Sequence, residues 1–285
     1  MLPFRRILFP IDYSEPCQAV VPYVQDMMRH FSADLTLVHA YAPEFARWEL
    51  ALADPEFPEK VRLLEEQRLR EFAVENFPGR HVESIAELGE PGSVIHKVVQ
   101  HQGTDLVMLA THGRGPVRRF LLGSVAAKVL HDIGAAVWTG VGSVFADHTP
   151  SLPYKSVLCA LDDGEEAQGV LKATAAFASG YKAGLSIVHV VETPPMTYKV
   201  DFSPYKKDLM SAADFRLREL KGESRIDAPH AVVDAGIPDG IRQEAARKNA
   251  DLIITGRGHA QAPFNAMRSC LYPIVRQSPC PVLSI

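Results

Sequence analysis

Short apolar runs rich in Val, Ile and Leu alternate with stretches of helical period along the whole chain. Runs such as ILFPI, LTLVHA and LVMLA are apolar at successive positions, which suits strands buried on both faces of a sheet. Helix-length spacers between them indicate parallel strands joined by right-handed crossovers. In the first half this pattern predicts strands near 5–11, 34–41, 82–87, 105–110 and 136–140, and helices near 15–31, 59–76, 92–102 and 122–132.

The second half of the chain repeats the first. RRILFPID at 5–12 has its counterpart in YKSVLCALD at 154–162, ADLTLVHAY corresponds to AGLSIVHVV, and GTDLVMLATHG corresponds to NADLIITGRGH. We infer a tandem duplication with domains at 1–143 and 154–285, in which the second copy forms the same elements as the first. The segment VFADHTPSLPY carries two prolines and few periodic residues, which predicts a linker at 144–153.

Two proline-broken segments, APEFARWELALADPEFP and ETPPMTYKVDFSPY, follow the second strands and differ most between the copies. We expect variable surface loops here, and lids over a site are the alternative.

The composition and charge of the chain indicate which partners and which cellular compartment to expect. The 285 residues are 47% hydrophobic with a formal net charge of -4, so the chain has no overall attraction for nucleic acid or an anionic membrane, and we expect neither as a partner. Its four cysteines lie far apart without metal-ligand spacing, which is typical of a reducing compartment. The apolar run before Asp12 is too short for a signal segment or a membrane span. These features predict a cytoplasmic protein.

One stretch, ATHGRGPVRRFLLGSVAAKVL at 110–130, combines flexible backbone, positive charge and the start of a helix. In open α/β sheets, ligands bind beyond the carboxyl ends of the strands, where glycines allow close approach and a helix start offers amide donors. The stretch therefore predicts an anion site, and a phosphate fits converging donors better than a carboxylate does. Ser124 would serve as helix N-cap or hydroxyl donor. An ordinary glycine-rich loop capped by serine is the alternative.

The glycine spacing does not match the two commonest nucleotide motifs, since no GxxxxGK[ST] is present and no GxGxxG follows the first strand. Gly113 is followed instead, after nine residues, by Gly123 and Ser124. This spacing resembles the universal stress protein family, whose ATP-binding members carry G-x-x-G, nine residues and G-[ST] after the fourth strand. The resemblance covers nearly the whole chain as two consecutive family domains and includes ILFPID, LTLVHA, GEP and GSVAAKVL. It implies two α/β doubly wound domains, each a five-stranded parallel sheet of order 3-2-1-4-5 with helices on both faces.

Carried over to this sequence, the family pattern implies which residues surround ATP, with or without Mg²⁺. The adenine and ribose would be bordered by Pro10, Ile11, Asp12 and Ala40. The phosphates would be surrounded by Leu109, Ala110, Gly113, Gly123, Ser124 and Val125.

Two of these residues have a physical interpretation of their own. A carboxylate at the end of a strand, such as Asp12, can accept hydrogen bonds from ribose hydroxyls or an adenine amino group, and it could equally cap the helix that starts near Ser14. Ala110 stands where the family has glycine. If that position needs a positive φ, alanine costs about 1 kcal/mol, and otherwise its methyl group is tolerated.

Charged and imidazole side chains near the site are open to more than one interpretation. The loop arginines either reach the phosphates or stay solvated, namely Arg114, Arg118 and Arg119. We assign no catalysis to His112, because the sequence shows no orienting partner for it. His39 and His189 end equivalent strands, and this matched placement favours a packed structural role over ligation.

The leading hypothesis is an ATP-binding universal stress protein that acts as a nucleotide-responsive regulator or stress-tolerance factor with little or no turnover. A slow ATP hydrolase or phosphotransferase is one alternative, in which Asp162 and Asp163 could share a magnesium ion with a bound nucleotide. A scaffold with a vestigial nucleotide site is the other.

The second copy is predicted to bind nucleotide more weakly or not at all. Gly256 restores the glycine that Ala110 lacks, but His259 takes the place of Gly113, and Arg268 or Ser269 takes the place of Gly123. Pro273 fits only the first turn of a helix, which predicts that the following helix starts late.

Each copy ends in an apolar strand, AAVWTG or CPVLSI, which would be an open edge of its sheet. The family resemblance implies pairing through this strand. We therefore expect the two copies to pair internally, and the same edge allows a homodimer.

Overall fold

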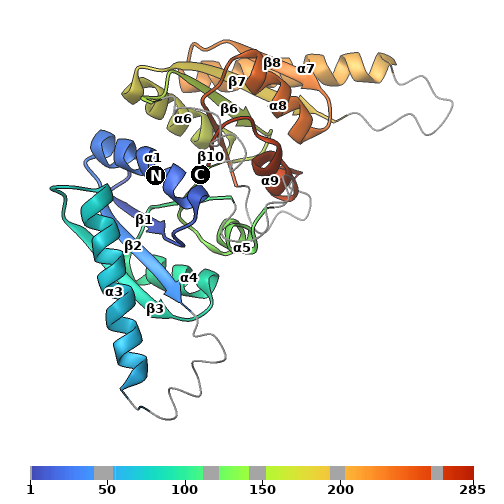
Figure 1. Cartoon of the computed structure of the whole chain (residues 1–285). Helices are drawn as coiled ribbons and strands as arrows, with labels where there is room; N and C mark the ends of the chain where they lie inside the picture. Colours follow the sequence, from blue (N-terminus) through green and yellow to red (C-terminus); the bar gives the residue numbers. More distant parts are fainter. Residues whose placement is uncertain are drawn as a thin grey trace. The chain divides into compact units, whose positions relative to one another are not determined.

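The structure is a computed structural model that describes residues 2–41, 54, 56–111, 122–140, 152–192, 203–257 and 266–285 (Figure 1). The chain divides into two compact units, Pro3–Phe145 and Ala146–Ile285. Except for Leu152 and Pro153, the expected linker lies outside the described residues. Most of the two proline-broken segments lies outside them as well, so the expectation of loops or lids is not tested there.

The first unit is a parallel sheet of order β3-β2-β1-β4-β5, as the family resemblance implies. Its strands are β1 (Arg6–Pro10), β2 (Asp34–Tyr41), β3 (Val82–Leu88), β4 (Leu106–Ala110) and β5 (Ala136–Gly140). Its helices are α1 (Glu15–Phe31), α3 (Phe57–Asn76), α4 (Pro91–Gln102) and α5 (Ser124–Asp132). The apolar runs and helical periods therefore predicted every one of these elements to within two residues at each end.

The second unit repeats this arrangement in the order β8-β7-β6-β9-β10. Its strands are β6 (Ser156–Leu161), β7 (Gly184–Val191), β8 (His230–Asp234), β9 (Leu252–Thr255) and β10 (Val282–Ser284). Its helices are α6 (Ala167–Tyr181), α7 (Ser203–Ser224), α8 (Ile237–Arg247) and α9 (Ala266–Gln277). The duplicated sequence has folded into duplicated structure.

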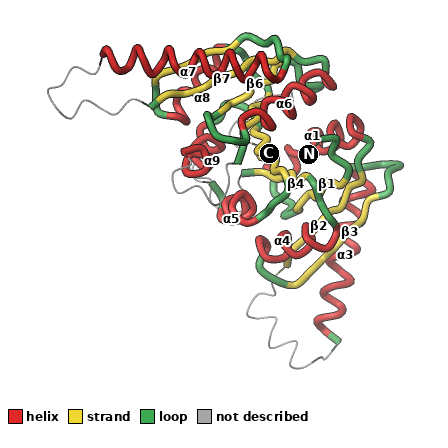
Figure 2. Tube along the Cα trace, turned by 180° about the vertical axis from the view of Figure 1, so that it is seen from behind, coloured by secondary structure: helices red, strands yellow, loops and turns green. Residues whose placement is uncertain are grey.

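Helices cover both faces of each sheet, which is why the central strands are apolar along most of their length (Figure 2). In the first unit α1 packs on β4 and α3 packs on β2 and β3, while α4 and α5 pack against each other. In the second unit α6 contacts α7, and α8 contacts α9. Right-handed crossovers in this strand order place the first two helices on one face and the last two on the other.

An aspartate before the fourth strand of each unit ties that strand to the first. In the first unit the Asp105 carboxylate accepts hydrogen bonds from the backbone N–H groups of Arg5 and Arg6, at 2.8 and 3.1 Å. Asp251 accepts from Lys155 and Ser156 in the same way, at 2.7 and 3.1 Å. This contact explains why both matched segments contain Asp-Leu. It holds the first and fourth strands of each unit side by side.

The prediction that the last helix of the second unit starts late is wrong. The helix α9 begins at Ala266, and Pro273 lies well inside it. A proline inside a helix removes one backbone hydrogen bond, and α1 tolerates Pro22 in the same way. Tertiary packing of the apolar face of α9, which includes buried Leu271 and Ile274, outweighs that local cost.

The motif GEP caps the start of α4. Glu90 is the N-cap residue and its carboxylate accepts hydrogen bonds from the N–H groups of Gly92 and Ser93, both at 2.9 Å, while Pro91 fills the first helical position. The Lys128 ammonium of α5 donates to the same carboxylate at 2.7 Å. The ion pair with Lys128, followed by these helix amides, lowers the pKa of Glu90 to about 2.

Replacing Glu90 with glutamine is expected to lower the free energy of unfolding at neutral pH by about 1 kcal/mol, a value discounted because the carboxylate is half exposed. The folded pKa lies below the ordinary value of 4.5, so this stabilisation is present above that value and is lost as the pH falls toward 2. Urea denaturation at pH 7 and pH 3 measures the difference between wild type and Glu90→Gln, which should shrink at the lower pH. A matched control is Glu75→Gln on α3, an exposed carboxylate. An equal difference at both pH values would contradict the assignment.

Candidate functional site

The carboxyl ends of β1, β2 and β4 meet at one edge of the first unit's sheet. Pro10 is in register with Val38 of β2, and β1 is also parallel to β4, with Leu8 opposite Val107. The crossovers from β1 and β4 leave toward opposite faces, and ligands bind at this point in open α/β sheets. The predicted residues at this edge are Pro10, Ile11, Asp12, Ala40, Leu109 and Ala110. Of these, Ile11 and Leu109 are buried and the others are half-buried.

Two backbone hydrogen bonds hold the start of α5 at the end of β4. The N–H of Thr111 donates to the carbonyl of Gly140 at 2.9 Å, and the N–H of Gly123 donates to the carbonyl of Thr111 at 2.8 Å. Gly123 and the first turn of α5 therefore lie at the carboxyl end of β4. Thr111 is buried, and nothing in the sequence pointed to this anchoring role.

Several predicted residues of the same loop fall outside the described ranges. They are His112, Gly113, Arg114, Arg118 and Arg119. The place of Gly113 beside the phosphates stays a prediction from the sequence, and the two interpretations of the three arginines stay open.

The N-cap residue of α5 is Gly123, so the expectation that Ser124 caps this helix is wrong by one residue. Gly123 is extended, with φ of -60° and ψ of 146°, and its carbonyl accepts from the N–H of Ala127 at 2.9 Å. Ser124 is exposed and is the first residue inside the helix, and Val125 beside it is half-buried. Gly123 has no side chain with which to cap α5, whereas Ser14 caps α1 and Glu90 caps α4. The first amides of α5 are thus left for water or a ligand.

Asp12 supports the cap of α1 from two residues before the N-cap Ser14, so the alternative that it is itself the N-cap is wrong. Its Oδ1 accepts from the N–H of Ser14 at 3.0 Å and from the Ser14 hydroxyl at 2.6 Å. Ser14 Oγ in turn accepts from the N–H of Cys17 at 3.3 Å. These contacts fix the orientation of a half-buried carboxylate at the ligand edge, and the sequence Ser-Glu-Pro was the available signal for the cap.

The alanine that replaces the family glycine causes no backbone strain. Ala110 pairs with Gly140 inside β4, and it is not among the described residues with positive φ. Its counterpart Gly256 is a glycine for a steric reason, because a Cβ there would lie 2.9 Å from a methyl group of Val170. The family glycine is therefore not required for conformation at residue 110.

The two matched histidines make the same structural contact. The Nδ1 atom of His39 lies 2.7 Å from the carbonyl oxygen of Ile11, and Nδ1 of His189 lies 3.0 Å from that of Leu161. Each imidazole thus holds the chain that leaves the first strand of its unit. His39 Nε2 also lies 3.7 Å from the Glu65 carboxylate. This geometry supports the packed role that the sequence predicted for both.

The described candidates for acid, base or nucleophile chemistry at this edge make structural contacts. The Asp12 carboxylate is bonded to Ser14, and His39 is bonded to Ile11. Burial raises the pKa of the Cys17 thiol to about 12, so it stays protonated at neutral pH. Within the described ranges, no three His, Cys, Asp or Glu side chains are arranged to hold a metal ion. The same part of the chain contains no helix long and apolar enough to span a membrane.

The second unit keeps the backbone of this edge and changes its side chains. The N–H of Arg257 donates to the carbonyl of Ile285 at 3.0 Å, as Thr111 does to Gly140. Asp162 accepts from the N–H of Gly164 at 3.2 Å, and Asp163 pairs with Arg216 at 3.3 Å. The side chains of His259, Arg268 and Ser269 are outside the described part of the structure.

Comparison with known proteins identifies the family of the chain. The model of the universal stress protein family matches residues 3–139 and again 153–285. A Staphylococcus haemolyticus protein named for this family is 30% identical over 134 residues, which cover 46% of this chain and 80% of the relative. A crystal structure of a universal stress protein from Archaeoglobus fulgidus superposes with a TM-score of 0.66 at 21% identity, covering 98% of this chain and 97% of that one. A Pseudomonas aeruginosa protein of unknown function also gives a TM-score of 0.66, at 15% identity over 99% of this chain and 92% of that one.

Proposed function

The chain belongs to the universal stress protein family with two consecutive domains, and from this premise we propose that its first unit binds ATP. The protein would act as a cytoplasmic nucleotide-responsive regulator or stress-tolerance factor with little or no turnover. The observation that carries the proposal is the uncapped start of α5, held at the carboxyl end of β4 by the hydrogen bond from Gly123 to Thr111.

The start of α5 supports phosphate binding through its free donors. Its N-cap residue Gly123 offers no capping side chain to the first amides, and the helix dipole adds partial positive charge at this end. Hydrogen bonds to a charged group contribute about 1.5–3 kcal/mol each. Three or four of them, less the cost of ordering the loop, would hold a triphosphate at about micromolar strength. Magnesium would be held mainly by phosphate oxygens, since Mg²⁺ needs only one or two protein carboxylates.

The nearby lysine on α5 is engaged by another helix. The Lys128 ammonium of α5 is bonded to Glu90 and to the Ser93 hydroxyl, at 2.7 and 2.9 Å, so this lysine stabilises α4 and is not needed by the ligand. The phosphate donors we propose are therefore the backbone amides and the Ser124 hydroxyl. Asp12, at the end of neighbouring β1, is held where it can accept from the ribose hydroxyls.

Mass spectrometry of the material released when the purified protein is denatured tests whether the first unit binds ATP. Tightly held ATP is expected at up to one molecule per chain. Protein from which nucleotide has been stripped should then take up added ATP. Stripped protein that binds no ATP at millimolar concentration would contradict the proposal.

Turnover of ATP is expected to be slow or undetectable, because no described residue pair at the edge is arranged to activate water. A phosphate-release assay with saturating ATP and Mg²⁺ measures it, and Gly123→Val serves as the background control. A rate of many ATP per second, lost when one side chain such as Asp12 is replaced by asparagine, would make the protein a hydrolase.

Pairing of two chains through the last strand of a unit is a further part of the proposal. We expect a dimer mass by light scattering at micromolar concentration, because the family resemblance implies pairing through this strand. A monomer mass across the whole micromolar range would exclude the chain dimer.

A further inference from the structure

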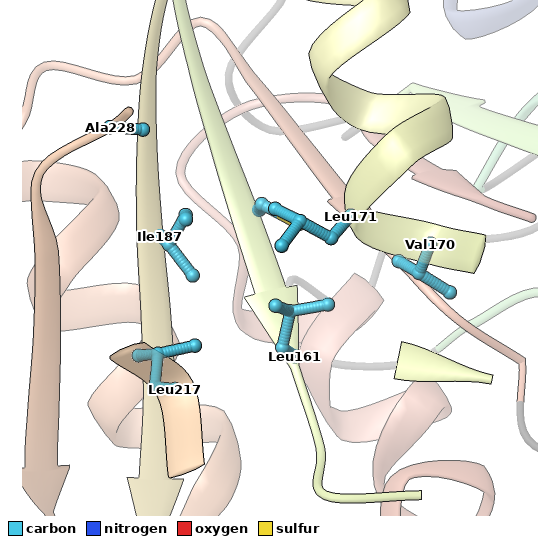
Figure 3. Packing of buried hydrophobic residues seen from close by; sticks show 7 residues of the cluster. Leu161, Val170, Leu171, Ile187, Leu217 and Ala228 are labelled. Atoms are coloured by element: carbon cyan, nitrogen blue, oxygen red, sulfur yellow. The ribbon is translucent and has the colours of Figure 1, made fainter. Parts of the chain in front are cut away.

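The second unit contains an open cavity of about 470 Å³ at the carboxyl ends of β6 and β7. It lies between α7 and the start of α8, and its wall includes Leu161, Val188 and Leu217, all of which are buried. Figure 3 shows Leu161 and Leu217 within the packed cluster that contains Ile187 and Leu171. A cavity of this size, with an apolar wall formed by a rigid core, suits a small organic ligand.

In the first unit, side chains occupy the part of the equivalent edge that lies against α3, beside the residues that we assign to the adenine and ribose. The Tyr13 ring lies 4.9 Å from the His39 ring and 5.9 Å from the Phe72 ring, and the Arg68 guanidinium lies 4.2 Å from its centre. Tyr13 corresponds to Asp163 in the repeat.

The helix over this edge also carries a smaller side chain in the second unit than in the first. When buried Leu69 of α3 is aligned with buried Leu217 of α7, Arg68 corresponds to Arg216 and Glu65 corresponds to Ala213. Loss of the aromatic ring and of the glutamate side chain explains why the second unit has space here.

The mouth of the cavity is acidic. Asp162, Asp163 and Glu192 line it, and the charged partners among the lining residues are Arg216 and, when protonated, His189. Arg216 is paired with Asp163 at 3.3 Å, and Nδ1 of His189 faces the Leu161 carbonyl oxygen. Asp162 and Glu192 therefore have no cationic partner among the described residues that line the cavity.

An anion is disfavoured at this mouth for a second reason. The Glu192 carboxylate accepts from the N–H of Ile237, the first residue of α8, at 3.2 Å. A helix start is the ordinary place for a phosphate, and here a carboxylate already occupies it. Like charges disfavour an anionic ligand, whereas an ammonium group would meet Asp162 and Glu192.

We propose that this cavity binds an amphipathic amine, with its hydrocarbon body against the apolar wall and its ammonium group at the acidic mouth. The half-buried Asp162 is the principal acceptor, because a carboxylate that accepts one hydrogen bond from Gly164 retains capacity for more. This site is separate from the ATP site of the first unit and does not depend on it.

Three chain-matched probes test the proposal: octylammonium, octanol and octanoate, each below its micelle concentration at neutral pH. Methyl NMR resonances of Ile237 and Ile241, which line the cavity, report binding, and Ile95 of the first unit is the internal reference. Octylammonium is expected to bind about tenfold more tightly than octanol, because it gains one charge-assisted hydrogen bond at a half-exposed site. Octanoate is expected to bind more weakly than octanol.

Three variants separate charge from space. Asp162→Asn should lower the octylammonium affinity about tenfold, to that of octanol, and leave octanol binding unchanged. Ala213→Phe should fill the cavity and abolish binding of all three probes. Asp239→Asn, an exposed carboxylate of α8 outside the cavity, should change nothing. The proposal is overturned if no probe shifts the Ile237 and Ile241 resonances, if octanol or octanoate binds as tightly as octylammonium, or if ATP displaces the amine.

Discussion

Replacing Gly123 with valine is expected to abolish detectable ATP binding, with a loss of affinity of at least about 100-fold. The substitution puts a branched side chain beside the first amides of α5, where we propose that the phosphates lie. Loss of two charged hydrogen bonds corresponds to about 3–6 kcal/mol, which exceeds two decades in Kd. Isothermal titration calorimetry of ATP into stripped wild-type and variant protein measures this difference.

The variant is expected to fold, because the backbone at Gly123 is one that any residue can adopt. Valine is a poorer N-cap than glycine, so a small decrease in Tm is expected. Gly134→Val is the matched control, since Gly134 follows α5 at its other end and a Cβ there meets nothing within 4 Å. Equal ATP affinity in wild type and Gly123→Val would remove the phosphates from this position.

The two units are expected to be unequal, with one tight ATP site per chain. The start of α9 differs from that of α5, because α9 begins at Ala266, before the Ser269 that aligns with Ser124. Its first amides are therefore displaced along the chain toward the N-terminus, the opposite direction to the one that Pro273 predicted. The Glu192 carboxylate, whose counterpart in the first unit is Ala42, adds repulsion for a triphosphate. We expect the second affinity to be lower by at least about 100-fold, a gap of roughly 3 kcal/mol.

Calorimetry at saturating ATP measures the stoichiometry directly. One site per chain in wild type and none in Gly123→Val is the expected pair of results. Two sites of matched affinity would show that the second unit retains a phosphate site despite the displaced helix start.

The sequence predicted the fold closely because strands in a doubly wound sheet are buried on both faces. Runs such as LVMLA leave little ambiguity about where β4 lies, and the repeat confirmed each assignment in a second copy. The edge that collects Asp12 and Ala110 followed from the strand order alone. Residues at the ends of parallel strands are the easiest site residues to predict.

Features that depend on contacts between distant side chains could not be predicted. The N-cap at Gly123 depends on its hydrogen bond to Thr111, and local preference had favoured Ser124. Pro273 was placed by a local rule that tertiary packing overrode. The cavity of the second unit depends on the small side chains of α7 that lie near Asp163. No pattern along the sequence shows that these two segments are close in space.

The central claim is that ATP phosphates bind the first turn of α5, and the backbone amide resonances of that turn test it most directly. On titration of stripped protein with ATP, the account predicts that the ¹⁵N–¹H resonances of Ser124, Val125 and Ala126 show the largest shifts, while those of Gly256 and Arg257 in the second unit move little. Saturable ATP binding that leaves the first turn of α5 unshifted, or that shifts the second unit instead, would contradict the account.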